Sequence, residues 1–342
     1  MSDFDEYKKL GEPGKIEKAA IWETAIGLQQ VDGLTPSLYL IETAKNHIDG
    51  DITIAEVKER LENYYKIHSK RLDTEERTEE ADKVSARIAE ILAEKTFSFS
   101  PAEYLTIHKR LFDGVFKAAG KIRDYNISKD EWVLNGDTVY YASADSIKAT
   151  LDYDFATEKS YDYSKLSKEA TVKHIAKFIS DIWQIHPFGE GNTRATAVFA
   201  IKYLRKFGFN VSNDLFANNS WYFRNALVRA NYVLVDSGIH ATMEYLNRFF
   251  DNLVLKQNNT LKNREMQIKV GTVNTHFDTV NGTVFDLIKN NHSITATEIS
   301  EQLGIGLRTV KRKIKDLKAK GVIERVGSDK TGSWKVLKGN PK

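Results

Sequence analysis

The chain has 342 residues, of which 41% are hydrophobic and 28% charged, a composition typical of a folded globular protein and not of a disordered one. It contains no cysteine, which excludes disulfides and thiolate metal sites and agrees with a reducing, cytoplasmic compartment. The net charge is +3, but residues 283–342 hold 13 Lys/Arg against 6 Asp/Glu, so a basic end module (+7) follows a mildly acidic body (−4) and favours an anionic partner.

The first part of the chain reads as short helices. The polar N-terminus lacks the apolar core of a signal peptide, and the chain has no apolar run of about 18 residues that would span a membrane. Residues 1–66 are expected to form helices around a break at "VDGLTPS", where Gly33 and Pro36 interrupt the pattern. A charged connecting helix is expected within residues 67–97.

Residues 98–255 are expected to form a helical body with one exception. The segment 126–143, "NISKDEWVLNGDTVYYAS", has strand-like residues around Asn135-Gly136, which predicts a β-hairpin. Residues 256–280 read as a polar linker. The chain is therefore expected to be mainly α-helical.

The stretch "HPFGEGNTR" (186–194) lies between two patterns of helical periodicity, so it is a loop that opens onto a helix N-terminus. The free N–H groups there favour an anion, and Gly191 permits a close approach of a phosphate. Asn192 and Arg194 would add donors, Glu190 would supply an oxygen ligand for Mg²⁺, and His186 would take a proton from a hydroxyl. The chemistry indicated is phosphoryl or nucleotidyl transfer. The alternative is a solvated loop between two helices.

This stretch resembles the active loop of the Fic family, HxFx[DE]GNGRxxR, and the resemblance extends over about residues 98–255. It implies His186 as the general base and Phe188 as the loop anchor. It also implies Mg²⁺ at Glu190 and ATP as the substrate. The nucleotide-binding residues that it implies are Gly189, Glu190, Gly191, Asn192, Thr193, Arg194 and Tyr222. The hairpin at 126–143 would be the family's flap, which pairs with an extended target segment.

The sequence departs from the family pattern at two positions. Thr193 replaces the second Gly of GNG, and Ala197 stands where many members have a final Arg that grips the γ-phosphate. The N-terminal segment resembles the antitoxin-like module of Fic proteins, whose inhibitory helix reads [ST]xxxE[GN]. "LQQVDG" (28–33) would be a degenerate form with Asp32 as the inhibitory residue, weakly clamped or redirected to Arg194. The alternatives are a plain helix C-terminus at Asp32 and a rival site at Glu90.

A further segment, residues 220–234, resembles the helix that completes the adenine pocket in Fic proteins. In "SWYFRNALVRANYVL" (220–234) the candidates are Tyr222, Arg224 and Asn231. The alternative is an aromatic stripe that packs in the core.

Residues 281–342 have the pattern of a winged helix-turn-helix: helices, a turn at Gly304, a basic third helix and two short strands. The candidate DNA-binding residues are Arg308, Thr309, Lys311, Arg312 and Lys315. The alternative is a protein-docking module with a solvated basic face.

Taken together, the resemblance implies a protein adenylyltransferase that moves AMP from ATP-Mg to a Tyr, Ser or Thr hydroxyl of a target protein, with the protein itself as a candidate target. Two alternatives stay open. One is a DNA-binding transcriptional regulator whose Fic domain senses nucleotide, and the other is a Fic enzyme that transfers another phosphate-containing group. The predicted partners are the target protein and duplex DNA, with no membrane; the oligomeric state is left open, a dimer included.

Overall fold

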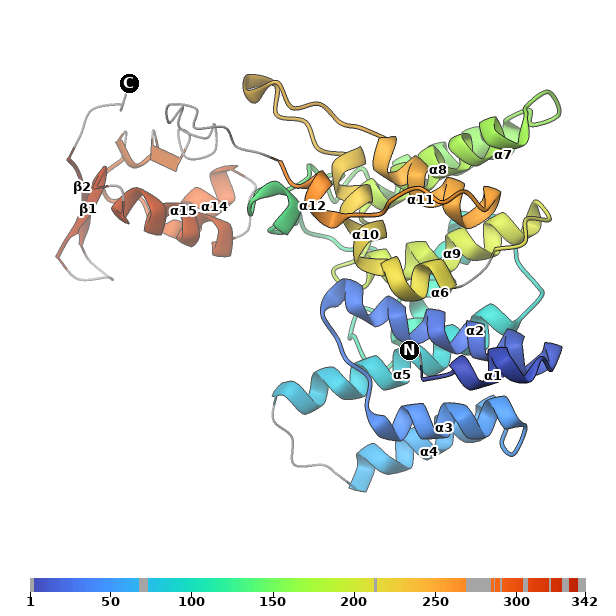
Figure 1. Cartoon of the computed structure of the whole chain (residues 1–342). Helices are drawn as coiled ribbons and strands as arrows, with labels where there is room; N and C mark the ends of the chain where they lie inside the picture. Colours follow the sequence, from blue (N-terminus) through green and yellow to red (C-terminus); the bar gives the residue numbers. More distant parts are fainter. Residues whose placement is uncertain are drawn as a thin grey trace. The chain divides into compact units, whose positions relative to one another are not determined.

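The structure is a computed structural model, and it is predominantly helical (Figure 1). It describes residues 3–67, 73–211, 214–268, 284–285, 287–289, 291–303, 307–319, 321–327 and 332–337. The chain divides into two compact units: residues 1–124 with 142–267, and residues 125–141 with 268–342. No helix among the described residues is long and apolar enough to cross a membrane.

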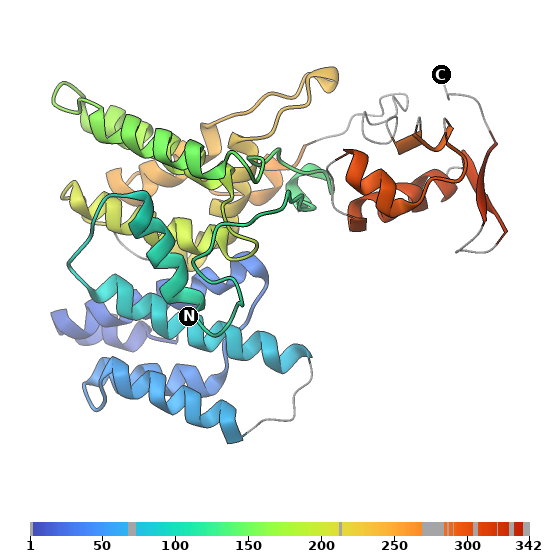
Figure 2. The ribbon, with the colours of Figure 1, turned by 180° about the vertical axis from the view of Figure 1, so that it is seen from behind.

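The N-terminal part of the first unit is a set of helices joined by short loops. Their bounds are α1 Asp5–Leu10, α2 Pro13–Gly27, η1 Leu28–Asp32, α3 Leu38–Asp49, α4 Ile54–Ile67 and α5 Asp73–Ala93. Pro13 begins α2, where its missing N–H costs nothing. The 3-10 turn η1 ends at Gly33, which has φ 67° and whose N–H bonds to the Gln30 carbonyl. The α3–α4 pair lies on the side of α2 and α5 that faces away from α9 (Figures 1 and 2).

The rest of the first unit is a helical bundle built around one central helix. The bounds are α6 Pro101–Phe112, α7 Ile147–Ser160, α8 Lys168–Ile185, α9 Asn192–Lys206, α10 Asp214–Ala230, η3 Val235–Ser237, α11 Glu244–Leu255 and α12 Asn263–Met266. Every side chain of α9 from Asn192 to Leu204 is buried. A helix buried on all sides must be surrounded by other elements. Aromatic rings of Phe99, Phe155, Phe178 and Tyr203 pack around Phe199 of this helix.

The segment 125–141 forms a chain reversal without the predicted strands. Asn135 (φ 54°) and Gly136 (φ 90°) make the turn that Asn-Gly predicts. The Glu131 N–H bonds to the Asp137 carbonyl at 2.9 Å, and the η2 turn (Trp132–Leu134) follows Glu131. Residues 125–141 contain no strand. A β-ladder does not form on either side of this turn, because some of the backbone groups bond elsewhere. The Val133 carbonyl, for example, accepts a hydrogen bond from the Ile268 N–H.

Residues 256–268 differ from the polar linker that the sequence predicts. They include α12, and Met266 and Ile268 are 1% and 9% exposed. Residues 269–280 of the predicted linker lie outside the described residues.

The C-terminal part of the second unit contains two helices and two strands of the predicted winged helix-turn-helix, and the predicted turn at Gly304 lies outside the described residues. Its elements are α14 Ala296–Leu303, α15 Leu307–Ala319, β1 Ile323–Val326 and β2 Ser333–Val336, with β1 and β2 antiparallel. Thr295 and Glu298 form a capping box at the start of α14, with Thr295 N–H bonded to the Glu298 carboxylate at 2.7 Å. Ile299, Val310 and Leu317 are buried in a core of its own, so this part has a hydrophobic centre separate from that of the bundle.

Candidate active site

The predicted loop joins two helices by two residues in the left-handed conformation. His186 ends α8 with φ 51° and ψ 59°, an uncommon conformation for a residue with a side chain. Gly191 precedes α9 with φ 75°, and a Cβ there would lie 2.4 Å from the Phe112 ring. Glycine is therefore required at 191 by both backbone angle and space. The first turn of α9 contains no Asp or Glu, so nothing on the helix itself opposes an anion at its N-terminus.

His108, a buried histidine that the sequence did not reveal, holds the part of the loop from Phe188 to Glu190. His108 stacks on Phe188 with ring centroids 3.6 Å apart. Its Nδ1 accepts the Gly120 N–H at 2.9 Å, so Nε2 carries the proton and donates to the Glu190 carbonyl, also at 2.9 Å. Burial lowers the pKa of His108 to about 4, which keeps the ring neutral near pH 7.

Two polar residues at the start of α9 are used to hold the loop itself. The Asn192 amide donates to the Phe188 carbonyl at 2.7 Å and accepts the Phe188 N–H at 3.0 Å. Thr193 accepts a hydrogen bond from Trp183 Nε1 at 3.0 Å. Asn192 is thus committed to the loop backbone and is not aimed at a ligand. Thr193, the departure from the family pattern, takes a bond that glycine could not make.

Arg123, which is 5% exposed, holds the part of the loop formed by His186 and Pro187. Its Nε donates to the His186 carbonyl at 2.8 Å, and its backbone N–H donates to the Pro187 carbonyl at 2.9 Å. Another guanidinium nitrogen donates to the Ala142 carbonyl. Arg123 therefore stabilises the strained backbone of His186.

The imidazole of His186 is 3% exposed, and its Nδ1 lies 3.3 Å from the Trp183 carbonyl. This contact favours the tautomer with the proton on Nδ1, in which Nε2 has the lone pair that accepts a proton. Glu190, four residues after His186 in the sequence, is exposed.

Arg194, by contrast, is enclosed by the N-terminal helices. Its side chain is 2% exposed; Nη2 lies 2.6 Å from Glu80 and Nε lies 2.8 Å from Asp32. Its Nη1 donates to the Gln29 amide oxygen at 3.0 Å. The Nε hydrogen does not point at the Asp32 oxygen, so that contact is an ion pair without a directed hydrogen bond. The guanidinium also lies 4.7 Å above the Phe112 ring. We call Gln29, Asp32 and Glu80 the Arg194 clasp.

The family model for the Fic/DOC family matches residues 98–204, which contain this loop and α9. These residues form a Fic/DOC domain. A second model, an HTH domain, matches residues 283–329. Both predictions, the Fic domain and the C-terminal helix-turn-helix, are confirmed.

Relatives of the Fic domain include two proteins whose names describe an activity. One is the protein adenylyltransferase VbhT of Bartonella schoenbuchensis, 29% identical over 111 residues, or 32% of this chain and 21% of VbhT. The other is the probable protein adenylyltransferase y4lH of Sinorhizobium fredii, 28% identical over 131 residues, or 38% of this chain and 64% of y4lH. The chain thus spans less than two thirds of each of these relatives.

Solved structures similar to the chain include two effector proteins of Bartonella. The N-terminal Fic domain of Bep8 from Bartonella sp. 1-1C gives a TM-score of 0.44 at 18% identity, covering 54% of this chain and 88% of that one. BepC from Bartonella tribocorum with bound AMPPNP gives 0.41 at 19% identity, covering 53% and 87%.

The candidate adenine-pocket residues of the Fic domain lie in or against its core. Tyr222 is 1% exposed, and its ring is parallel to that of Phe249. Asn231 donates to Ser180 and to the Leu227 carbonyl, and Arg224 lies over the Trp221 ring. The burial of Tyr222 favours a core role over nucleotide binding, and the amide of Asn231 is already bonded within the bundle.

Glu90, the alternative inhibitory residue, forms ion pairs with residues other than Arg194. Glu90 pairs with Lys58 at 2.5 Å and lies 3.8 Å from Arg110. Glu80, two turns or more towards the start of α5, reaches Arg194 instead. The sequence reading missed Glu80 because one acidic residue among several in a charged helix carries no local signal.

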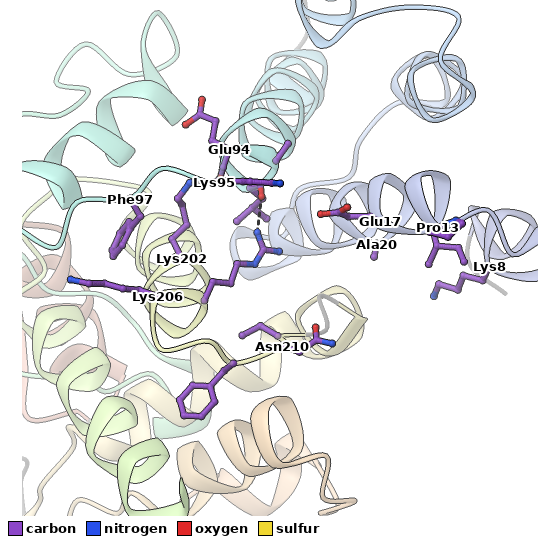
Figure 3. Close-up of a pocket in the computed structure, with 16 residues that line it drawn as sticks. Lys8, Pro13, Glu17, Ala20, Glu94, Lys95, Phe97, Lys202, Lys206 and Asn210 are labelled. Carbon is purple, nitrogen blue, oxygen red and sulfur yellow. Dashed lines mark hydrogen bonds between the residues drawn. The ribbon is translucent and has the colours of Figure 1, made fainter. Parts of the chain in front are cut away.

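A cavity of the first unit lies at the other end of α9. It measures about 810 Å³ and is lined by no residue of the loop 186–194. Lys8, Pro13 and Glu17 line one side, and Phe97, Lys202 and Lys206 the other (Figure 3). Lys202 is 4% exposed and donates to the carbonyls of Ile91 and Glu94, so it caps the end of α5.

The candidate DNA-binding residues lie on α15, the basic helix of the HTH domain. Lys311 and Lys315 are exposed, whereas the side chain of Arg308 lies outside the described residues. Thr309 bonds to Ser128 at 3.0 Å, and Arg312 pairs with Asp130 at 3.1 Å. Two of the predicted residues are therefore in contact with the segment 125–141.

Proposed function

We propose that the Fic domain is a protein adenylyltransferase that moves AMP from ATP to a Tyr, Ser or Thr hydroxyl of a protein. The observation that carries the proposal is the loop itself. It places the His186 imidazole and the N-terminus of α9 at its two ends and is held in a strained conformation by Arg123 and His108. Strained backbone kept in place by several partners is typical of functional sites. The names of VbhT and y4lH support the choice of AMP as the transferred group.

In the proposed reaction the target hydroxyl oxygen attacks the α-phosphorus of ATP. The new O–P bond forms as the bond between the α-phosphorus and the bridging oxygen breaks, and pyrophosphate leaves. Nε2 of His186 takes the hydroxyl proton, with Nδ1–H oriented by the Trp183 carbonyl. The N–H groups of the first turn of α9 bind phosphate oxygens. Arg194 would add a cation for the phosphates once it is released from the clasp.

The residues present fit a magnesium ion that is held mainly by the nucleotide. Among the described residues, no group of three or more His, Cys, Asp or Glu is arranged to hold a metal. A single exposed carboxylate, Glu190, beside a phosphate-binding helix end is a donor set that suits Mg²⁺, which prefers a few carboxylates together with phosphate oxygens. The ion would neutralise phosphate charge during transfer.

We also propose that the clasp restrains the enzyme and that Asp32 is its inhibitory residue. The two carboxylates and one amide oxygen leave Arg194 with its charge already compensated. A phosphate chain would have to displace these partners to gain the guanidinium. Because the clasp competes with the phosphates for one cation, it lowers the rate without closing the site.

Incubation of the protein with each labelled nucleoside triphosphate and Mg²⁺, followed by mass spectrometry of the protein, tests the proposal. We expect a mass increase of one AMP from ATP, which is absent in His186→Ala. An increase of one UMP or one phosphate instead would assign another transferred group. No modification in wild type and in a clasp variant alike would favour the sensor alternative.

A second function, binding of duplex DNA, is proposed for the C-terminal domain. It is favoured by the match to an HTH domain and by six Lys/Arg against one Asp in residues 307–319. A gel-shift titration at several salt concentrations tests it, because binding through phosphates weakens steeply as salt rises.

A further inference from the structure

Within the second unit, residues 125–141 lie on the helix that is predicted to read DNA. We call these residues the turn segment. Ser128 Oγ is 3.0 Å from Thr309 Oγ1, and Arg312 Nη1 is 3.1 Å from Asp130 and donates to the Gly136 carbonyl at 2.9 Å. These are a hydroxyl contact, an ion pair and a backbone bond from one face of α15.

The turn segment has further partners that keep it in this position. The Ile268 N–H donates to the Val133 carbonyl at 2.9 Å, and the Asn135 amide donates to the Ile268 carbonyl at 2.9 Å. Val133 and Leu134 are 0% and 1% exposed, so the segment contributes apolar side chains to the packing. The contact with α15 therefore consists of three polar contacts made by a segment that is itself held in place by Ile268.

The charges of the two surfaces are complementary. The turn segment contains Asp130, Glu131 and Asp137 against Lys129, whereas residues 307–319 contain six Lys/Arg against one Asp. Gly136 presents its carbonyl oxygen, and a Cβ there would lie 3.2 Å from Arg312 Nη1. An acidic loop that offers oxygen acceptors to an arginine and a threonine makes the contacts that a DNA backbone would make.

We infer that the turn segment is an internal competitor for the DNA-binding face of α15, so that DNA and the segment exclude each other there. The inference rests on the proposed DNA binding of the C-terminal domain. While Thr309 Oγ1 and Arg312 Nη1 bond to the segment, these atoms are not available to a phosphate or a base. By linkage, DNA weakens the hold of α15 on the segment as much as the segment weakens the affinity for DNA.

The turn segment is connected at its two ends to residues that hold the loop 186–194. The turn segment continues into Asp124 and Ala142, where Arg123 donates to the Ala142 carbonyl and to the carbonyls of His186 and Pro187. Release of the segment from α15 therefore frees a stretch whose two ends are tied to the loop that carries His186.

A disulfide tests the inference, because the natural chain has no cysteine. Ser128→Cys with Thr309→Cys in the full-length protein should form an intramolecular disulfide under mild oxidation, detected by mass spectrometry of unreduced peptides. We expect the oxidised protein to bind a 30-base-pair duplex of random sequence at least about ten-fold more weakly than the same protein after reduction, since the face is then held covered. The matched control is Ser143→Cys with Ser146→Cys, whose hydroxyl oxygens are 2.9 Å apart outside the segment. Its oxidation should leave DNA binding unchanged.

A second variant loosens the contact without a cross-link. Asp130→Asn should raise DNA affinity about two- to five-fold, the range of one exposed ion pair. Asp137→Asn removes the same charge from a carboxylate that bonds to Thr138 within the segment, and it should have a smaller effect.

Three results would overturn the inference. If the 128–309 disulfide does not form, the contact is wrong. If it forms and DNA affinity is unchanged, the segment does not cover the DNA-binding face. If the reduced protein and Asp130→Asn both fail to bind DNA while the disulfide still forms, the proposed DNA function is wrong and the competition falls with it.

Discussion

Asp32 and Arg194 form an ion pair, with Oδ2 2.8 Å from Nε, between the end of the N-terminal η1 turn and the first turn of α9. Glu80 of α5 holds the same guanidinium from another helix at 2.6 Å. The sequence predicted a weakened clamp because Asp is short and Ala197 replaces an arginine. In the structure a second carboxylate, that of Glu80, also pairs with Arg194.

The first prediction separates the two carboxylates of the clasp. Asp32→Ala should raise the initial rate of self-modification only several-fold, since Glu80 still holds Arg194. Asp32→Ala combined with Glu80→Ala should raise it about ten-fold or more, because Arg194 then becomes available to the phosphates. The matched control is Glu90→Ala, on the same helix but paired with Lys58. Equal rates for wild type and the double variant would make the N-terminal part a structural cap.

The second prediction concerns the base. His186→Ala should abolish transfer and leave ATP binding close to wild type, because in the proposed reaction the imidazole acts on the incoming hydroxyl and not on the nucleotide. The measurement combines calorimetric ATP titration with mass spectrometry of the modified protein. Retained transfer would assign the base to another residue.

The third prediction concerns the metal ligand. Glu190→Gln should weaken Mg²⁺-dependent nucleotide binding, because a neutral amide is a poorer ligand for a hard cation. Nucleotide affinity is measured as a function of Mg²⁺ concentration. Superimposable curves for variant and wild type would exclude Glu190 as the ligand.

The fourth prediction concerns pH and His108. Burial lowers the pKa of His108 to about 4 from 6.5, so between these values the unfolded chain binds a proton that the folded chain does not. The free energy of unfolding should therefore fall as pH drops from about 6.5 towards 4, with His108 contributing up to ~3 kcal/mol of the loss. His108→Gln, which keeps a donor for the Glu190 carbonyl, should show a shallower fall in melting temperature. His47, whose pKa is also lowered to about 4 by burial, remains in both proteins. Parallel melting curves over this range would contradict the assignment.

The fifth prediction concerns the separation of the two functions. Deletion of residues 281–342 should remove DNA binding and retain the ability to transfer AMP, since the HTH domain has its own core. The affinity of the full-length protein for duplex DNA should fall steeply with salt. Binding that is insensitive to salt would favour a protein-docking role for the module.

The sequence predicted those features that depend on local patterns. The helix period around residues 186–194 and the Asn135-Gly136 turn are each encoded within a few residues. Asp32 was a candidate because a family pattern marks its position.

The residues that the sequence did not reveal act over long separations in the chain. His108, Arg123 and Glu80 reach the active loop from other elements, and their neighbours in sequence show no unusual spacing. The strands around Asn135 are absent because tertiary bonds to Ile268 and Arg312 take some of the backbone groups that a ladder would use. Tyr222 could not be assigned from sequence because an aromatic residue on a helix suits a core as well as a ligand pocket.

The bonds at the far end of α9 bear on how the proposed clasp could be released. Lys202 and Arg205 bond to the last carbonyls of α5, so these two helices are joined where α5 ends. Glu80 lies in the first half of α5, away from this junction. A partner that moves the first turns of α5 would therefore take one carboxylate away from Arg194 while the bonds between the ends of α5 and α9 stay in place.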